Sequence, residues 1–267
     1  MPPERQVRAK MLHTPALDLP PPFRLVTLRE VGDALAHATA NAVELGAGTL
    51  IYVGRFDLAE FALVLEPDEP LRTARRTLYA GMTALADALA AHSPPEKPMA
   101  IDWPDAVSVD GGLVGGGRLA WPEGPEDEPP AWLVFSAMIR TVAMGEDEPG
   151  LRPLVAALEE EGFSELGSGR LVESFARHFM VAVDTWQEQG FGAVAKSYLA
   201  YLAPEPGARR DIDDNGDLLI RRAGPPPILP REQGRNKGTG KAEVERRTLL
   251  PVLSSPTWFD PHKRGPR

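Results

Sequence analysis

The chain has 267 residues, 43% of them hydrophobic, which is enough to bury a sizeable core in one large domain or in a large domain with a small one. Its 38 acidic and 29 basic residues give a net charge of −9, which argues against the nucleic-acid backbone as a general partner. Cysteine is absent, which excludes disulfides, thiolate metal sites and a thiol nucleophile.

The amino-terminal stretch from Met1 to Pro22 is rich in proline and has little periodicity. We expect an extended arm over residues 1–22 that packs on the body only near Leu17 to Phe23. The chain has no run of 18 apolar residues, and its start lacks the charged and apolar segments of a secretory signal. The sequence therefore predicts no membrane partner, and a cytoplasmic location follows by default.

Apolar residues recur at helical spacing from Val31 to Leu45, and Gly46 suits the end of that helix. This start leaves no room for an amino-terminal helix-turn-helix. Leu50 to Val53 and Phe61 to Leu65 then predict two strands joined by a hairpin connection.

A long amphipathic helix is predicted from Leu71 to Leu89, because apolar residues form a stripe along it and prolines follow it. The stretch from Ile101 to Trp121 predicts a strand, a turn and a second strand. Gly111 and Gly112 favour the turn. The three glycines from Gly115 to Gly117 are typical either of a bulge or of a close approach between the backbone and a ligand.

The apolar segment from Ala131 to Arg140 predicts a central strand, and helices are predicted over 151–161, 171–187 and 191–202. Arg209 to Arg222 predicts a hairpin around Asp-Asn-Gly. Together these elements predict an α+β fold with a mixed, mostly antiparallel central sheet, helices packed on it and a small carboxy-terminal β-rich segment. We expect a main domain over residues 23–203.

Residues 204–267 are expected to form a small β hairpin or cap region with a flexible stretch rich in proline and glycine over 224–240. Trp258 and Phe259 are an apolar pair, so we expect this region to dock back on the body. Asp211 to Gly216 fits the first half of a calcium loop, but Arg222 stands where that loop needs a glutamate, so a turn is favoured. The five histidines never fall at metal-ligand spacing, and no metal site is predicted.

The stretch from Ile101 to Trp121 resembles the biotin/lipoate protein ligase family, here as a divergent branch. In that family a K-W-P-N-D segment followed by K-x-x-G lines the site that joins a carboxylic acid to ATP. Trp103 and Pro104 match the W-P pair, and Gly115 matches the last glycine. Both family lysines are replaced, the first by Asp102 and the second by glycine, while Asp105 stands in place of asparagine.

Two further regions extend the resemblance to about residues 20–223. Gly46 and Gly48 match the glycines of the family's G-R-G-R loop, although its arginines are absent. The segment from Trp186 to Phe191 is similar to the family's W-x-x-x-G-F region, and Asp214 to Ile220 is similar to the opening of its small β domain. The resemblance therefore implies the family's ligase fold for residues 23–203.

The family's first lysine places a positive charge beside an acyl-adenylate phosphate. Two opposite charges about 4 Å apart attract by about 4 kcal/mol at an effective dielectric near 20. Asp102 at this position forfeits that attraction and adds a repulsion, so an arginine from elsewhere would have to restore the charge. Arg55 and Arg118 are the nearest candidates in the sequence.

The resemblance implies two alternative functions. The first is an ATP- and magnesium-dependent ligase that activates biotin, lipoate or a related acid and attaches it to a lysine of an acceptor protein domain. The second is a non-catalytic binding or accessory protein that keeps the ligase fold. No catalytic residue is assigned, and the candidate substrate- and nucleotide-binding residues are Gly46, Gly48, Arg55, Trp103, Pro104, Asp105, Gly115, Gly116, Gly117 and Arg118.

Overall fold

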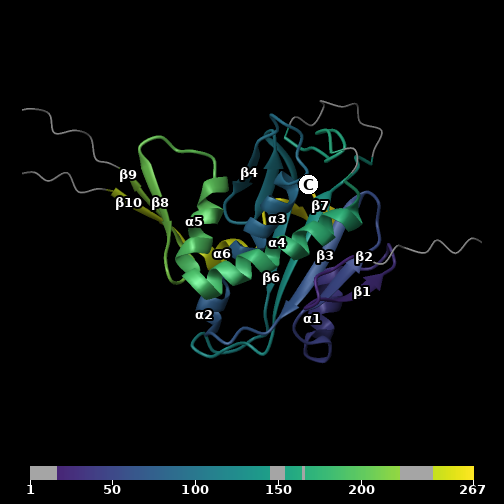
Figure 1. Cartoon of the computed structure of the whole chain (residues 1–267). Coiled ribbons are helices and arrows are strands. Elements are labelled where there is room, and N and C mark those ends of the chain that lie inside the picture. Colours follow the sequence, from purple (N-terminus) through teal and green to yellow (C-terminus); the bar gives the residue numbers. More distant parts are fainter. Residues whose placement is uncertain (1–16, 145–153, 164–165, 223–242) are drawn as a thin grey trace, which may run out of the picture.

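A seven-stranded sheet forms the centre of the molecule (Figure 1). The computed structural model describes residues 17–144, 154–163, 166–222 and 243–267. Neighbouring strands are antiparallel, except for one parallel pair at an edge, β1 and β2. In spatial order the strands are β1 (Arg24–Leu28), β2 (Thr49–Val53), β3 (Leu58–Leu65), β7 (Leu133–Arg140), β6 (Gly112–Ala120), β5 (Ala106–Val109) and β4 (Met99–Asp102).

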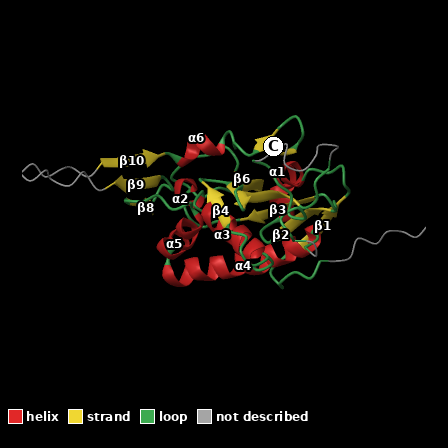
Figure 2. Ribbon diagram, turned by 90° about the horizontal axis from the view of Figure 1, so that it is seen from above, coloured by secondary structure: helices red, strands yellow, loops and turns green. Residues whose placement is uncertain are grey.

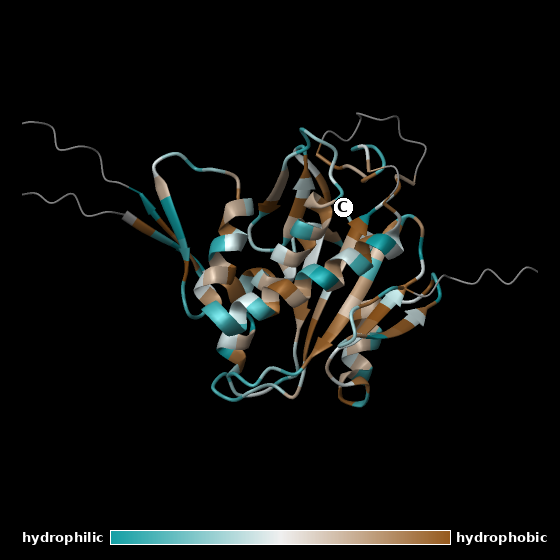
Figure 3. Cartoon of the chain, viewed as in Figure 1, coloured by the Kyte–Doolittle hydropathy of each residue, from teal (hydrophilic) through white to brown (hydrophobic). Residues whose placement is uncertain are grey.

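Helices α3 (Thr77–Ala90) and α4 (Ser168–Gln189) cover one face of this sheet, with α5 (Phe191–Tyr201) beside them (Figure 2). Figure 3 shows largely hydrophobic central strands and hydrophilic residues on the outward side of α4. The interface between the sheet and α4 is aromatic: the ring of Phe175 lies 4.5 Å from that of Phe61 and 5.6 Å from that of Phe135. This layer is the main hydrophobic core.

The opposite face of the sheet is covered in part by α1 (Ala34–Leu45). Asp33 caps this helix by accepting a hydrogen bond from the Ala36 N–H at 2.8 Å. Small alanines on its inner side let it lie close to the sheet, where they pack against aliphatic side chains of β2, β3 and β7. The rest of this face is left for other segments of the chain.

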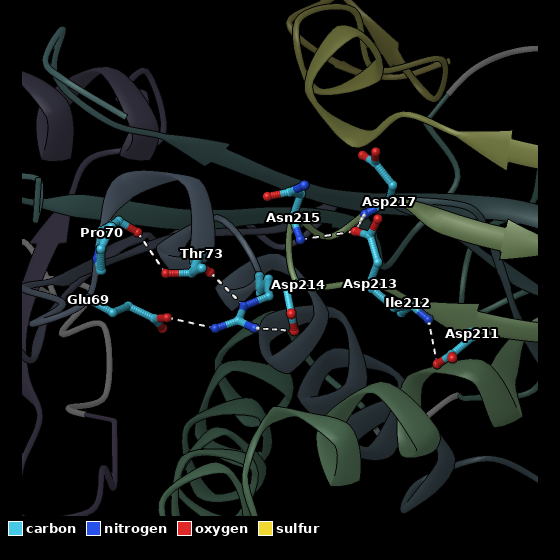
Figure 4. Close-up of polar contacts among 10 residues, drawn as sticks. Glu69, Pro70, Thr73, Asp211, Ile212, Asp213, Asp214, Asn215 and Asp217 are labelled. Carbon is cyan, nitrogen blue, oxygen red and sulfur yellow. Dashed lines mark hydrogen bonds and ion pairs between the residues drawn. The ribbon is translucent and has the colours of Figure 1, made fainter. Parts of the chain in front are cut away.

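A second, three-stranded sheet follows α5. Its strands are β8 (Ala208–Ile212), β9 (Leu218–Arg222) and β10 (Glu243–Arg247), and α6 (Leu249–Leu253) follows it. The turn between β8 and β9 is closed by Asp213, whose carboxylate accepts hydrogen bonds from the N–H groups of Asn215 and Asp217 at 3.0 Å each (Figure 4). The Asp213 carboxylate therefore serves the backbone of its own turn.

The last twelve residues, Pro256 to Arg267, return to the central sheet and are called here the carboxy-terminal cap. It contains two short paired strands, β11 (Phe259–Asp260) and β12 (Gly265–Pro266). Strand β12 lies against β6 and β7 on the same side of the sheet as α1 (Figure 2). Trp258 is 1% exposed, which confirms the prediction that this end of the chain docks on the body.

The structure confirms the predicted fold class, and it corrects two predicted helices. The segment from Leu154 to Phe163 forms turns, because its backbone bonds to the sheet: the Ala156 N–H donates to the Leu113 carbonyl at 3.0 Å. The predicted helix from Leu71 to Leu89 is divided into α2 (Leu71–Ala74) and α3. The division falls at Arg75 and Arg76, and the Arg75 guanidinium turns inward to lie 4.7 Å from the centre of the Trp121 ring.

Several predictions from the sequence fall on residues outside the described ranges. They are the first part of the extended arm, residues 151–153 of the predicted helix and the stretch rich in proline and glycine over 224–240. Within the described arm, Leu17, Leu19 and Phe23 pack on the main core as expected. None of the described helices combines the length and apolar character that crossing a membrane requires.

Candidate functional site

Two buried tyrosines hold the turn formed by Trp103 and Pro104, which joins β4 to β5. The Tyr198 hydroxyl donates to the Pro104 carbonyl at 2.9 Å, and the Trp103 indole N–H donates to the Tyr79 hydroxyl at 3.2 Å. The two tyrosine rings meet edge to face with centres 4.6 Å apart. Trp103 therefore faces the helices α3 and α5 and packs against the main hydrophobic core. Neither tyrosine is predicted from the sequence, because a tyrosine on an apolar helix face has no distinguishing pattern.

The three glycines of β6 make close contacts on both faces of the sheet. A Cβ added to Gly117 would lie 2.5 Å from the Met82 sulfur on the helix face. A Cβ added to Gly116 would lie 2.6 Å from the Trp258 ring on the opposite face. Gly115 has φ +153°, and a Cβ there would overlap the Met138 carbonyl. The glycines thus do allow close approach, and the groups that approach belong to the protein itself.

Arg118 follows the glycines and lies on the face that carries the cap. Its guanidinium lies 4.4 Å from the centre of the Phe259 ring. It interacts electrostatically with Asp33, Glu60 and Asp105, yet it forms no ion pair with any carboxylate in the described parts of the chain. Partial burial lowers its pKa from the usual arginine value. Arg118 is therefore a half-buried cation with acidic side chains nearby and an aromatic ring over it.

Asp105 is a buried acid on this face, with 2% of its surface exposed. Burial raises its pKa to about 7, because the charged form loses its hydration. The Trp258 indole N–H and the Arg118 charge oppose this rise. The indole nitrogen nevertheless completes no hydrogen bond with any described residue, so its contact with Asp105 is a weak one.

Glu60 is a second buried acid, on β3. Its side chain accepts a hydrogen bond from the Ala34 N–H at 2.8 Å, at the start of α1. Burial is the largest influence on Glu60 and raises its pKa. Carboxyl groups from the N-cap of α1, from β3 and from the turn before β5 thus lie near the half-buried Arg118, and the charges of Arg55 and Arg264 also act on Glu60.

Arg55 lies at the edge of this region, on the connection between β2 and β3. Its guanidinium forms a bidentate ion pair with the Asp57 carboxylate, with N···O distances of 2.7 and 3.1 Å. Ser168 of α4 donates a hydrogen bond to the Arg55 carbonyl and fixes the connection from behind. Because the charge of Arg55 is already paired, Arg118 is the more available cation. Asp102, at the family's lysine position, is exposed to solvent.

Gly46 and Gly48 lie at the other end of β2. Gly46 ends α1, and the Gly48 N–H donates to the Val64 carbonyl at 2.9 Å. Arg55 follows the far end of the same strand, so the structure does not bring these glycines together with Arg55 or Arg118. The glycine at the site end of β2 is Gly54, which the sequence does not predict as a site residue.

The described residues contain no group of three or more histidine, aspartate or glutamate side chains arranged to hold a metal ion. The carboxylates of the Asp213 turn are instead used by backbone N–H groups and by Arg246, which lies 2.9 Å from Asp213. The side chain of Asp217 also accepts from the Leu249 N–H at 3.0 Å and so joins the turn to α6.

Comparisons with known proteins identify the family of this chain. The model of the biotin/lipoate A/B protein ligase family matches residues 19–200. A biotin--[acetyl-CoA-carboxylase] ligase of Paracoccus denitrificans is 29% identical over 189 residues, which cover 63% of this chain and 75% of that protein.

Two solved structures show the same fold. A biotin protein ligase-like protein of unknown function from Silicibacter sp. TM1040 is 25% identical with a TM-score of 0.69, and the match covers 89% of this chain and 99% of that one. The biotin protein ligase of Aquifex aeolicus is 15% identical with a TM-score of 0.59, over 74% of this chain and 91% of the other. The family match spans more than half of the chain, so this protein belongs to the biotin/lipoate A/B protein ligase family.

Proposed function

We propose that this protein is an ATP-dependent ligase that activates biotin or a related carboxylic acid and transfers it to a lysine of an acceptor protein domain. The observation that carries the proposal is Arg118, a half-buried cation that forms no ion pair with the described residues and lies on the sheet face beside Asp105 and the glycines of β6. It supplies the positive charge that the family lysines would supply, from a different position on the sheet.

The charge of Arg118 on this face favours an anionic ligand, whereas Trp258 occupies the space that the ligand would need. Arg118 would hold a phosphate or a carboxylate, and Gly116 leaves room for close approach to the backbone. In the present arrangement that room is filled by Trp258. When bound, ATP supplies the adenylyl group that activates the acid. We expect magnesium to accompany it, because this ion is held mostly by phosphates and water with one or two carboxylates.

The choice of biotin as first substrate rests on the relatives. The Paracoccus protein is a biotin--[acetyl-CoA-carboxylase] ligase, and an Aquifex aeolicus biotin protein ligase has been solved in complex with biotin and ATP, with a TM-score of 0.54 to this chain. A carboxylase domain that carries a target lysine is accordingly the acceptor we propose. Lipoate remains the second acid to test.

The test is acid-dependent release of pyrophosphate from ATP and magnesium, measured separately with biotin, lipoate and octanoate. We expect turnover with one of these acids, and we expect Arg118→Ala to lower kcat/KM at least about tenfold, equivalent to about 1.4 kcal/mol of transition-state stabilisation. Arg55→Ala is the matched control, because it removes an arginine whose charge is already paired with Asp57. Equal losses in the two variants would remove Arg118 from the proposed role.

A second candidate is a non-catalytic binding protein with the same fold, which is favoured by the exposed Asp102 at the family's lysine position. An Asp102→Lys variant separates the two proposals. Pyrophosphate release by the unaltered chain supports the ligase. If neither protein releases pyrophosphate while calorimetry still detects biotin binding, the result supports the binding protein.

A further inference from the structure

The carboxy-terminal cap covers the part of the sheet that the proposed function assigns to the ligand. Trp258 packs with Leu58, Ala106 and Met138, which come from three different strands. The same ring lies against the Gly116 backbone, and the neighbouring Phe259 lies over Arg118. One short segment therefore occupies the glycine run, the buried acid and the available cation together.

Polar groups at the contact between the cap and the sheet, one in the cap and one beneath it, are incompletely satisfied. The Trp258 indole nitrogen is buried without a hydrogen-bond partner among the described residues. Arg118 meets an aromatic ring, while three acids lie near it. A segment built only to seal the sheet would match an apolar face with apolar groups, because an unpartnered buried N–H destabilises the closed form. The surface beneath the cap retains groups suited to a polar ligand.

Apart from the packing of Trp258, the cap is held to the body by polar contacts at its margin. Arg264 forms an ion pair with Asp33 at 3.0 Å, and its side chain is 65% exposed. The Arg140 guanidinium donates to the carbonyls of Pro266 and Arg267 at 2.9 and 2.8 Å. The two strands of the cap have only two residues each, too few to be stable alone. Such a segment can open locally while the seven-stranded sheet stays folded.

We propose that the carboxy-terminal cap is an intrachain competitor of the ligand: Trp258 and Phe259 occupy the binding surface in the closed form, and the cap opens as a unit to admit the ligand. The identity of the ligand rests on the proposed function, but the opening of the cap does not. A cap that is closed most of the time lowers the apparent affinity by the fraction of molecules that are open. The closed form is therefore autoinhibited.

The opening can be measured without any ligand, because the chain contains no cysteine of its own. Met138→Cys places a thiol beneath Trp258, whereas Ala137→Cys places one on the next residue of β7, in the core that α3 and α4 cover. The two parent side chains are 6% and 1% exposed. We expect a thiol reagent to label Met138→Cys at least about tenfold faster than Ala137→Cys under native conditions, because local opening needs less free energy than global unfolding.

Equal labelling rates, both set by global unfolding, would overturn the proposal, because the cap would then open only when the whole protein does. The stability of both variants is measured by urea unfolding, so that a difference in global unfolding is not mistaken for local opening. This result stands whether or not the protein is a ligase.

The competition is tested by calorimetric titration of Trp258→Ala with biotin and with ATP separately. We expect at least about tenfold tighter binding of one of them than by the unaltered chain, because the closed form loses its main anchor. Trp132→Ala is the matched control, since Trp132 is a half-buried tryptophan that packs beside α1. Weaker or unchanged binding by Trp258→Ala overturns the competition. If neither protein binds biotin or ATP while Met138→Cys is labelled fast, the opening of the cap is supported and the two proposed ligands are rejected.

Discussion

The buried carboxyl group of Asp105 gives the site an ionisation that falls in the physiological range. Its pKa is about 7 in the folded protein, against 3.8 for an ordinary aspartate. The folded state therefore binds the proton more tightly than the unfolded state does. Protonated Asp105 is compatible with its buried place beside Trp258, whereas the charged form loses hydration that Arg118 restores only in part.

The contribution of Asp105 to stability is present below pH 4 and is lost as the pH rises to about 7, because the folded pKa lies above the unfolded one. Asp105→Asn removes the ionisation while it keeps the shape of the side chain. One pKa unit corresponds to about 1.4 kcal/mol. We therefore expect the difference in free energy of unfolding between Asp105→Asn and the parent to shift by a few kcal/mol in favour of Asp105→Asn as the pH rises from about 4.5 to about 8. Urea unfolding of both proteins at several pH values measures this difference, and a difference independent of pH would contradict it.

At the level of single residues, the sequence indicated Trp103, Asp105 and Arg118, because the W-P motif and its spacing survive in this chain. It indicated that Trp258 would dock on the body, but not that Trp258 would contact Gly116, because the chain returns to the sheet more than 130 residues later. It could not indicate Tyr198 either, because its partner is a backbone carbonyl, which every residue has. The sequence therefore predicted the strand and the turn of the site. Trp258 and Tyr198, which contact them, are brought there by the tertiary fold.

At the level of elements, α5 positions the W-P turn through one hydroxyl. Tyr198 is fully buried, and among the described residues its hydroxyl bonds to the Pro104 carbonyl alone. Tyr198→Phe leaves that carbonyl without this donor, and we expect a loss of about 1–3 kcal/mol in the free energy of unfolding. Urea unfolding provides the measurement. Tyr201→Phe is the control, because its hydroxyl bonds to Asp87 at a half-exposed position and its loss should be below about 1 kcal/mol.

The sequence predicted most elements whose apolar residues repeat regularly, such as α4, α5 and β7. It failed where backbone pairing with distant strands decided the conformation. The acidic stretch from Leu154 to Phe163 has a helical pattern, but the Leu158 N–H donates to the Arg140 carbonyl of β7 at 3.0 Å. Strand β1 is short and has an irregular burial pattern, so its pairing with β2 left no period of two to detect.

At the level of the whole molecule, the small sheet and the central sheet share one core. Ile212, Leu218 and Leu249 belong to the same cluster of buried residues as α3 and α4. We therefore expect a single unfolding transition, with coincident curves from far-ultraviolet circular dichroism and tryptophan fluorescence. Leu249→Ala should lower the free energy of unfolding by about 2–5 kcal/mol without splitting the transition. Two separate transitions would show that the small sheet folds independently.

The strand order of the central sheet also determines how it is assembled. One half, β1 to β3, is built from nearby residues, and so is the antiparallel meander from β4 to β7. The two halves meet at β3 and β7, where Leu65 pairs with Leu133, a separation of 133 − 65 = 68 residues. Closing so long a loop loses more conformational entropy than closing a hairpin does. Each half of the sheet can therefore form locally before β3 pairs with β7. We expect the pairing of β3 with β7 to form after the pairings within each half of the central sheet.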